Sequence, residues 1–265
     1  MDPTPIHAFN PGPITGEGNW TWLLRGRVPT LVDAGTGDPR LLEAVERALG
    51  GARLAQVLVT HGHGDHASGV PALRDRFPGI RFRKLAWPER DAKWPVDWEL
   101  IADGATIEAG DTTFVAVHTP GHAPDHLCFW HEASRTLFCG DLAIKGNTVW
   151  IPAHLQGDLA DYLRSLERVL ALAPARLLPA HGPVIDEPAS LLRGYLDHRR
   201  EREAQVVAAL RSGASTPDAI VSLVYRGLEP SLVPLAKESV TAHLVKLERE
   251  GRARRHGDAW HIIDA

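Results

Sequence analysis

The chain has 265 residues, of which 44% are hydrophobic, and a formal net charge of −4 at pH 7. It is long enough to bury one large core, or a large core and a small one, and we favour two units. The slight acidity excludes a global basic field that would draw it onto nucleic acid, and no run approaches the roughly 20 apolar residues of a membrane span.

The first part of the chain alternates short strands with turns. Apolar and β-branched runs predict strands at residues 19–26, 29–35 and 52–60, with a helix over 38–51 between the last two. Asp38 and Pro39 suit the start of this helix, and Gly50 and Gly51 its end. A short helix from about His66 to Arg76 should follow. Further strands are expected at 81–87, 112–119, 126–131 and 135–141.

Several of these strands run directly into a histidine or an aspartate. A helix from about Asp158 to Leu172 precedes one more strand at 175–182, which also contains a histidine. The residues that follow apolar strands in this way are His61, His122, Asp141 and His181. Loops at the ends of a sheet are where a rigid scaffold commonly presents functional groups.

From Glu187 onward the pattern becomes helical. Helices are expected within 188–213, 216–227 and 234–251, followed by two strands around a Gly-Asp turn in 252–265. Three helices and a terminal hairpin are typical of a winged-helix unit. We therefore predict a hydrolase domain over 1–186 and a winged-helix-like domain over 187–265.

The strongest chemical signal is the segment His61-Gly62-His63-Gly64-Asp65-His66. Four side chains that can bind a metal fall within six residues, and the glycines between them allow the loop to turn tightly enough for them to converge. Imidazoles and carboxylates without a thiolate suit zinc, with manganese or iron as other candidates. A polar surface loop with chance histidines is the alternative, which the downstream residues disfavour.

The segment THGHGDH resembles the H-x-H-x-D-H signature of the metallo-β-lactamase superfamily. The resemblance continues in order through TPGH, FCGD and PAHGPV. It implies an α/β fold, the αββα sandwich, and a binuclear zinc site. By analogy with the family, one metal would be held by His61, His63 and His122, the other by Asp65, His66 and His181, and Asp141 would bridge them.

Within the superfamily, a bridging Asp141 is similar to hydroxyacylglutathione hydrolases, lactonases and RNA-processing members, whereas β-lactamases of this fold carry Cys or Ser near this place. The segments HTPGHAPDH and LPAHGPVI and the helical tail resemble a branch of short β-lactamase-like proteins with a C-terminal winged-helix-like domain. That branch includes the animal mitochondrial endoribonuclease, which acts on single-stranded RNA.

The resemblance implies a zinc-dependent hydrolase that attacks an ester, thioester or lactone of a small-molecule substrate through a metal-bridging hydroxide, with Asp65 as the catalytic proton acceptor. Three alternatives remain open: an endoribonuclease on single-stranded RNA, a promiscuous β-lactam hydrolase, and a non-enzymatic winged-helix DNA-binding protein. Substrate identity and oligomeric state are not indicated by the sequence.

Four further residues are candidates for supporting the metal ligands or facing the substrate. Asp33 ends a strand and resembles the family's aspartate beneath the metal loop, where a carboxylate orients a ligand imidazole. Asp125 and His126 follow His122, and His154 lies in the loop after Asp141. For Asp125 and His126, polar residues at the start of a strand are an equally good interpretation.

The last expectations concern the two cysteines, the N-terminus and the tail. No signal-peptide pattern opens the chain, so we expect a cytoplasmic protein, in which Cys128 and Cys139, on facing strands of a hairpin, are free thiols. Between Leu244 and His256, five cations face two acids, but a solvated helix end explains them as well as a phosphate-binding patch. The tail should pack on the hydrolase domain and border the active-site mouth.

Overall fold

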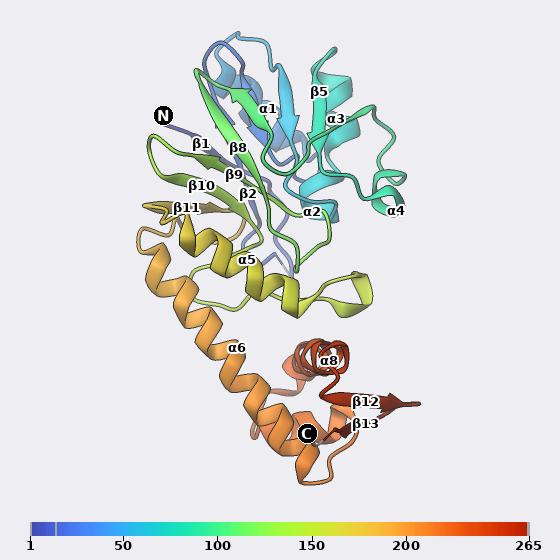
Figure 1. The fold of residues 1–265 in the computed structure, drawn as a ribbon. Coiled ribbons are helices and arrows are strands. Elements are labelled where there is room, and N and C mark those ends of the chain that lie inside the picture. The colour runs from blue at the N-terminus through green and yellow to red at the C-terminus, as the bar shows by residue number, and fades with distance from the viewer. Residues whose placement is uncertain (1, 14, 264–265) are drawn as a thin grey trace.

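The computed structural model describes residues 2–13 and 15–263 and shows two sheets packed face to face (Figure 1). The first sheet has the order β1-β2-β3-β4-β5-β6. Its strands are Thr4–His7, Trp20–Leu24, Thr30–Val32, Gln56–Leu58, Arg81–Lys84 and Trp98–Leu100. The second has the order β11-β10-β9-β8-β7. In chain order its strands are Thr106–Ala109 (β7), Thr112–His118 (β8), Leu127–His131 (β9), Thr136–Gly140 (β10) and Arg176–Pro179 (β11).

Helices cover the outer face of each sheet. The first sheet is covered by α1 (Pro39–Leu49) and α3 (Val70–Arg76), and the second by α5 (Leu159–Ala171) and the start of α6 (Pro188–Arg211). Shorter helices are α2 (Gly64–Ala67), α4 (Pro88–Asp91) and η1 (Ala153–Leu155). The layers are therefore helix, sheet, sheet and helix, as the αββα prediction requires.

Strand alternation builds the apolar layers between these elements. In β9, Leu127 and Phe129 point into the layer between the sheets, while Cys128 and Trp130 point toward α5 and α6. Side chains of successive strand residues point to opposite faces, so one strand contributes to two cores. Both faces of β9 and β10 are buried, and this fixes their register against slippage.

The C-terminal part has its own apolar core. It contains the second half of α6, α7 (Pro217–Val224), η2 (Pro230–Leu232), α8 (Val233–Arg249) and the hairpin of β12 (Ala253–His256) and β13 (Ala259–Ile262). This is the winged-helix arrangement. The helix α6 runs between the two bodies (Figure 1) and contributes Leu192 and Leu196 to one core and Val206 and Leu210 to the other. The division at residue 186 stays a prediction.

Most expected elements are present, with differences at glycine and proline positions. The helix expected from His66 to Arg76 is interrupted at Ser68 and Gly69, giving α2 and α3. Gly69 packs against the turn after β3, where a Cβ atom would lie 2.2 Å from the Ala34 carbonyl oxygen. The chain therefore bends here to fit that turn, and helical periodicity alone does not show it.

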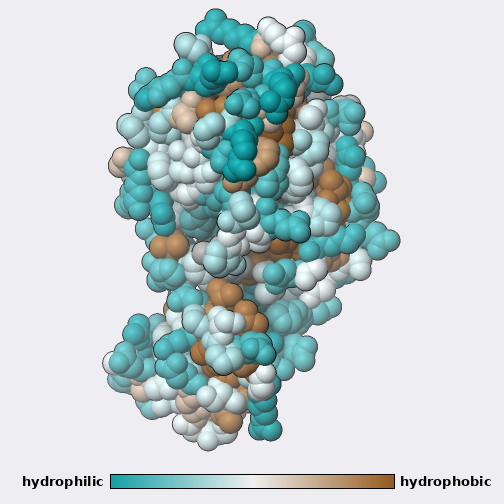
Figure 2. Space-filling model, turned by 180° about the vertical axis from the view of Figure 1, so that it is seen from behind, coloured by the Kyte–Doolittle hydropathy of each residue, from teal (hydrophilic) through white to brown (hydrophobic). Residues whose placement is uncertain are grey.

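The strands β1, β6 and β7 were not among the expected elements. The strand β1 is at one edge of its sheet and pairs with β2, Pro5 opposite Trp22, and an edge strand tolerates a proline. Of the helices in the described residues, none is both long and apolar enough to cross a membrane. Seen from behind, apolar surface gathers where the C-terminal part joins the larger body (Figure 2).

Candidate metal centre

The loops at one end of the two sheets bring together all seven residues expected to bind metal. His61 and His63 follow β4, and Asp65 and His66 lie in α2. His122 follows β8, Asp141 follows β10 and His181 follows β11. Parallel and antiparallel strands of both sheets therefore deliver their functional side chains to the same edge of the sandwich.

The first cluster consists of three imidazoles. Nδ1 of His63 lies 3.0 Å from Nε2 of His61 and 2.9 Å from Nε2 of His122. Burial, reinforced by the neighbouring imidazoles, lowers the pKa of His63 to about 2. These rings are therefore neutral, which is the form of histidine that binds a metal ion.

The second cluster mixes imidazoles with carboxylates. Oδ2 of Asp65 lies 3.4 Å from Nε2 of His66 and 3.3 Å from Nε2 of His181, and Oδ1 of Asp141 lies 3.4 Å from each of the same two nitrogens. Burial lowers the pKa of His181, but the carboxylates of Asp141 and Asp65 outweigh it and raise the pKa to about 10. The two carboxylates therefore favour a positive charge at this imidazole, and a metal cation would supply it in place of the proton.

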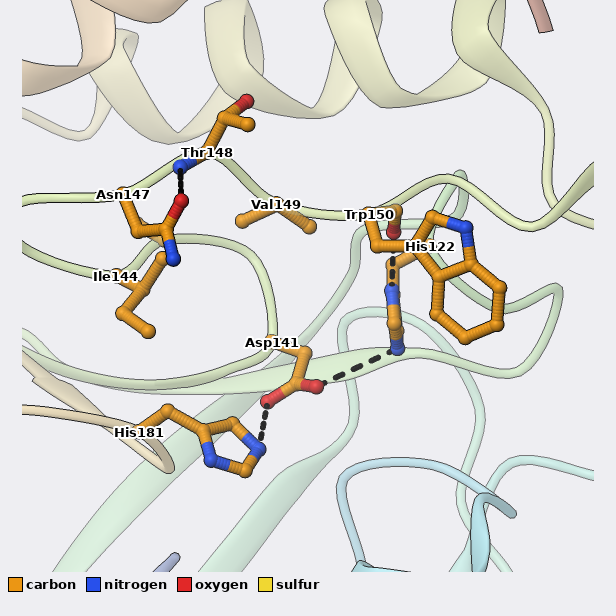
Figure 3. Close-up of a pocket in the computed structure, with 9 residues that line it drawn as sticks. His122, Asp141, Ile144, Asn147, Thr148, Val149, Trp150 and His181 are labelled. Carbon is orange, nitrogen blue, oxygen red and sulfur yellow. Dashed lines mark hydrogen bonds and ion pairs between the residues drawn. The ribbon is translucent and has the colours of Figure 1, made fainter. Parts of the chain in front are cut away.

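The carboxylate of Asp141 faces both clusters. Its Oδ1 atom points to the second cluster, while its Oδ2 atom lies 3.4 Å from Nε2 of His122 in the first. Figure 3 shows this carboxylate between His122 and His181. A single side chain that presents one oxygen to each cluster is what a bridging ligand requires.

Coordination of a metal ion explains the arrangement of these donor atoms better than hydrogen bonds between them do. Ligands about 2.1 Å from a tetrahedral ion lie about 3.4 Å apart, close to the distances in the second cluster and around Asp141. Moreover, Nε2 of His66 and Oδ1 of Asp141 are buried and, among the described residues, have no hydrogen-bond partner. Buried polar atoms are rarely left unpaired, and a divalent cation would satisfy both. The residues present therefore fit the metal.

Buried polar side chains hold the ligands in place. Asp33 accepts hydrogen bonds from the backbone N–H of Thr60 at 2.7 Å and from Nδ1 of His66 at 2.9 Å, so that Nε2 of His66 points to the second cluster. His126 accepts from the backbone N–H of Asp141 at 3.1 Å. Both were candidates from the sequence, and both lie directly behind ligands.

The other two candidates lie elsewhere. Asp125 is fully buried with its carboxylate 2.8 Å from Nζ of Lys84, also fully buried, and so does not face a substrate. His154 is on the surface, where its Nδ1 atom lies 3.0 Å from Glu238 of α8. It therefore joins the loop after Asp141 to the C-terminal domain, which a sequence pattern could not show.

Two residues that support the ligands were not identified from the sequence. The Thr60 hydroxyl lies 3.0 Å from both oxygens of Asp33 and 3.1 Å from Nδ1 of His61. Nδ2 of Asn19 donates to the backbone carbonyl of Asp65 at 2.7 Å. Thr60 directly precedes the metal motif, which was an available signal, whereas Asn19 is 46 residues away from Asp65 in the chain and gave none.

Comparison with known proteins identifies the fold. Residues 14–181 match the family model of the metallo-beta-lactamase superfamily, and residues 216–260 match that of the beta-lactamase associated winged helix domain. The chain belongs to the metallo-beta-lactamase superfamily. A "Beta-lactamase-like protein 2 homolog" of Caenorhabditis elegans is 31% identical over 257 residues, covering 94% of this chain and 84% of the relative.

Other members of the superfamily add to this picture. An "Atrochrysone carboxyl ACP thioesterase" of Aspergillus chevalieri is 30% identical over 279 residues, covering 97% of this chain and 86% of the relative. A metallo-beta-lactamase family protein of Thermus thermophilus superposes with a TM-score of 0.80 at 21% identity, covering 99% of this chain and 98% of that one. The last similarity shows the fold of the whole chain, C-terminal part included.

Proposed function

We propose that this protein is a binuclear metal-dependent hydrolase that cleaves a thioester, ester or lactone of a small molecule. The observation that carries the proposal is the carboxylate of Asp141, whose two oxygens face two separate ligand clusters at 3.4 Å. The cluster is compatible with divalent metal ions, and we propose zinc as the native metal on the basis of its imidazole and carboxylate donors.

The roles of the residues follow from their positions. His61, His63 and His122 would hold one ion and Asp65, His66 and His181 the other. When bound, a pair of such ions would polarise the scissile carbonyl and lower the pKa of a water. Asp65 would accept the proton of the attacking water, while Asp33 and His126 keep His66 and the backbone of Asp141 in position.

Thioesters are our first choice of substrate within this class. Superfamily relatives that cover most of this chain are named as thioesterases. The pocket beside the clusters is also lined by uncharged residues, apart from His122, Asp141 and His181.

An RNA substrate needs cations along its backbone, but most basic residues of the tail form ion pairs with acidic residues of this chain. Nη1 of Arg252 lies 2.6 Å from Glu203, Nζ of Lys246 lies 2.7 Å from Glu203, and Arg249 pairs with Asp158.

The test combines metal content with a panel of substrates. Protein purified without chelator and resupplied with zinc should contain two equivalents by elemental analysis, and Asp141→Ala should lower the affinity of one ion more than that of the ion with three imidazoles. The zinc-loaded protein should hydrolyse acyl thioesters faster than bis(p-nitrophenyl) phosphate or single-stranded RNA. A content that never exceeds one equivalent would refute the bridging role, and faster cleavage of RNA would refute the substrate class.

A further inference from the structure

The wall of the pocket beside the metal clusters is an irregular segment of chain. A cavity of about 100 Å³ is lined by His122, Asp141 and His181 and by uncharged side chains that follow β10. These are Ala143, Ile144, Asn147, Thr148, Val149 and Trp150. Figure 3 shows Ile144 and Val149 above Asp141, and the ring of Trp150 beside His122. The space admits several groups of the size of a methylene or a water molecule.

The conformation of this segment depends on hydrogen bonds with another element. Residues 143–152 form neither helix nor strand, so their carbonyl groups lack the regular partners that secondary structure supplies. The partners come from α6. The hydroxyl of Tyr195 lies 2.6 Å from the carbonyl oxygen of Ile144 and 2.7 Å from that of Asn147, and it accepts from the backbone N–H of Ile144.

Arg199, one turn further along α6, completes this attachment. Its guanidinium donates to the hydroxyl of Thr148 at 3.0 Å and to the carbonyl of Val149, although the residue is only 4% exposed. The next carbonyl, that of Trp150, accepts from Nδ1 of His122 at 2.7 Å. The same segment therefore contacts α6 at Val149 and a histidine of the first cluster at Trp150.

We propose that Ile144, Val149 and Trp150 form a binding site for a short, uncharged acyl group, and that Tyr195 and Arg199 are positioning residues that set its width. This rests on the proposed function, since an acyl group must be present in the substrate. Ile144, Val149 and Trp150 offer mainly apolar surface and the metal clusters form the floor, so the acyl carbonyl would lie over the metals and its alkyl chain against Val149. Helix α6 thus decides which acyl groups fit.

The expected selectivity follows from burial of the alkyl chain. Each buried methylene contributes about fourfold to binding, so a butanoyl thioester, with two more methylenes than an acetyl thioester, should have a kcat/KM about fifteenfold higher. The experiment measures kcat and KM of the zinc-loaded full chain on acetyl, butanoyl and hexanoyl thioesters of N-acetylcysteamine. The dissociation constants of the matching carboxylates, measured by calorimetry, give a readout that needs no turnover.

Four variants separate the acyl site from a general loss of structure. Val149→Phe fills the cavity and should remove most of the butanoyl preference in both readouts. Tyr195→Phe and Arg199→Met release the wall and should flatten the dependence on chain length, with Arg199→Lys restoring part of it. Arg202→Met is the matched control, because Arg202 lies on the same helix but packs 4.1 Å from the ring centre of Tyr225 inside the C-terminal domain. Its chain-length profile should equal that of the unaltered protein.

The outcomes distinguish this inference from the proposed function. If the unaltered protein hydrolyses the thioesters but Val149→Phe and Tyr195→Phe keep its chain-length profile, the acyl site is refuted and the hydrolase is not. If Arg202→Met flattens the dependence of kcat/KM on chain length as much as Tyr195→Phe and Arg199→Met do, the positioning role of Tyr195 and Arg199 is refuted. If no thioester, ester or lactone is cleaved while two metals are bound, the proposed function fails and the acyl site fails with it.

Discussion

Removal of the carboxylate charge behind His66 is the sharpest test of how the centre is built. Asp33 is 2% exposed, and its Oδ2 atom accepts from Nδ1 of His66 at 2.9 Å. Its φ of 64° is left-handed, and asparagine tolerates that conformation as well as aspartate does. Asp33→Asn therefore keeps the shape and the acceptor for Thr60, but places an amide where the His66 N–H needs an oxygen.

The magnitude follows from the geometry. Loss of an orienting partner behind a ligand imidazole typically costs about 10–100-fold in metal affinity, or about 1.4–2.8 kcal/mol. The loss should fall on the ion held by Asp65, His66 and His181, because the histidines of the first cluster do not bond to Asp33 through their own side chains in the described residues. Competition with a chelator, resolved into two binding steps, measures it.

A matched variant provides the control. Asp125→Asn also neutralises a buried carboxylate, but that carboxylate pairs with Lys84 instead of a ligand histidine. It should lower the free energy of unfolding without a selective loss of one metal. If Asp33→Asn binds both ions as tightly as the unaltered protein, or loses both equally, the reasoning that Asp33 orients His66 is refuted.

Three further outcomes are expected. Asp65→Asn should lower turnover on any substrate at least a hundredfold, since positioned proton transfer contributes about 10²–10⁴-fold; retention of more than about a hundredth of the activity would contradict its role. Lys84→Met should lower the free energy of unfolding by about 3–5 kcal/mol, because it leaves Asp125 buried and unpaired. Burial already raises the pKa of Asp125, so as the pH falls this carboxyl is protonated in the folded protein before it is protonated in the unfolded chain. The loss of unfolding free energy in Lys84→Met, measured by urea denaturation, should therefore shrink as the pH falls. Cys128 and Cys139 are free and buried, and burial raises the pKa of Cys128 to about 12. A disulfide reagent at pH 8 should therefore find both thiols only after denaturation, and rapid labelling of the native protein would contradict this.

The packing of helix α6 agrees only in part with what was expected for the tail. The tail was expected to pack on the hydrolase domain, and Leu191, Leu192, Tyr195 and Leu196 do so. Val206, Val207 and Leu210 lie on the same helix but pack into the core of the C-terminal part. Amphipathic spacing shows that a helix face needs an apolar partner, but it does not show which of two cores supplies that partner.

The sequence by itself indicated the family and the fold, and it named the seven residues that the structure brings together at one edge of the sandwich. It could do so because a ligand motif is local: the glycines between His61 and His66 and the apolar strands before His122, Asp141 and His181 are visible as patterns. Helix α1 was equally visible, since Asp38 and Gly50 cap it as expected. These features depend on residues that are neighbours in the chain.

Only the tertiary structure decided which residues support the cluster and what covers it. Asn19 reaches Asp65, and Arg199 and Tyr195 reach the segment after β10, across gaps of 46 to 51 residues. Asp125 and His154, which looked equivalent to His126 in the sequence, point to Lys84 and to Glu238 instead. Such contacts depend on how the sheets twist and where α6 crosses them, so the direction of each side chain is set by packing and not by spacing along the chain.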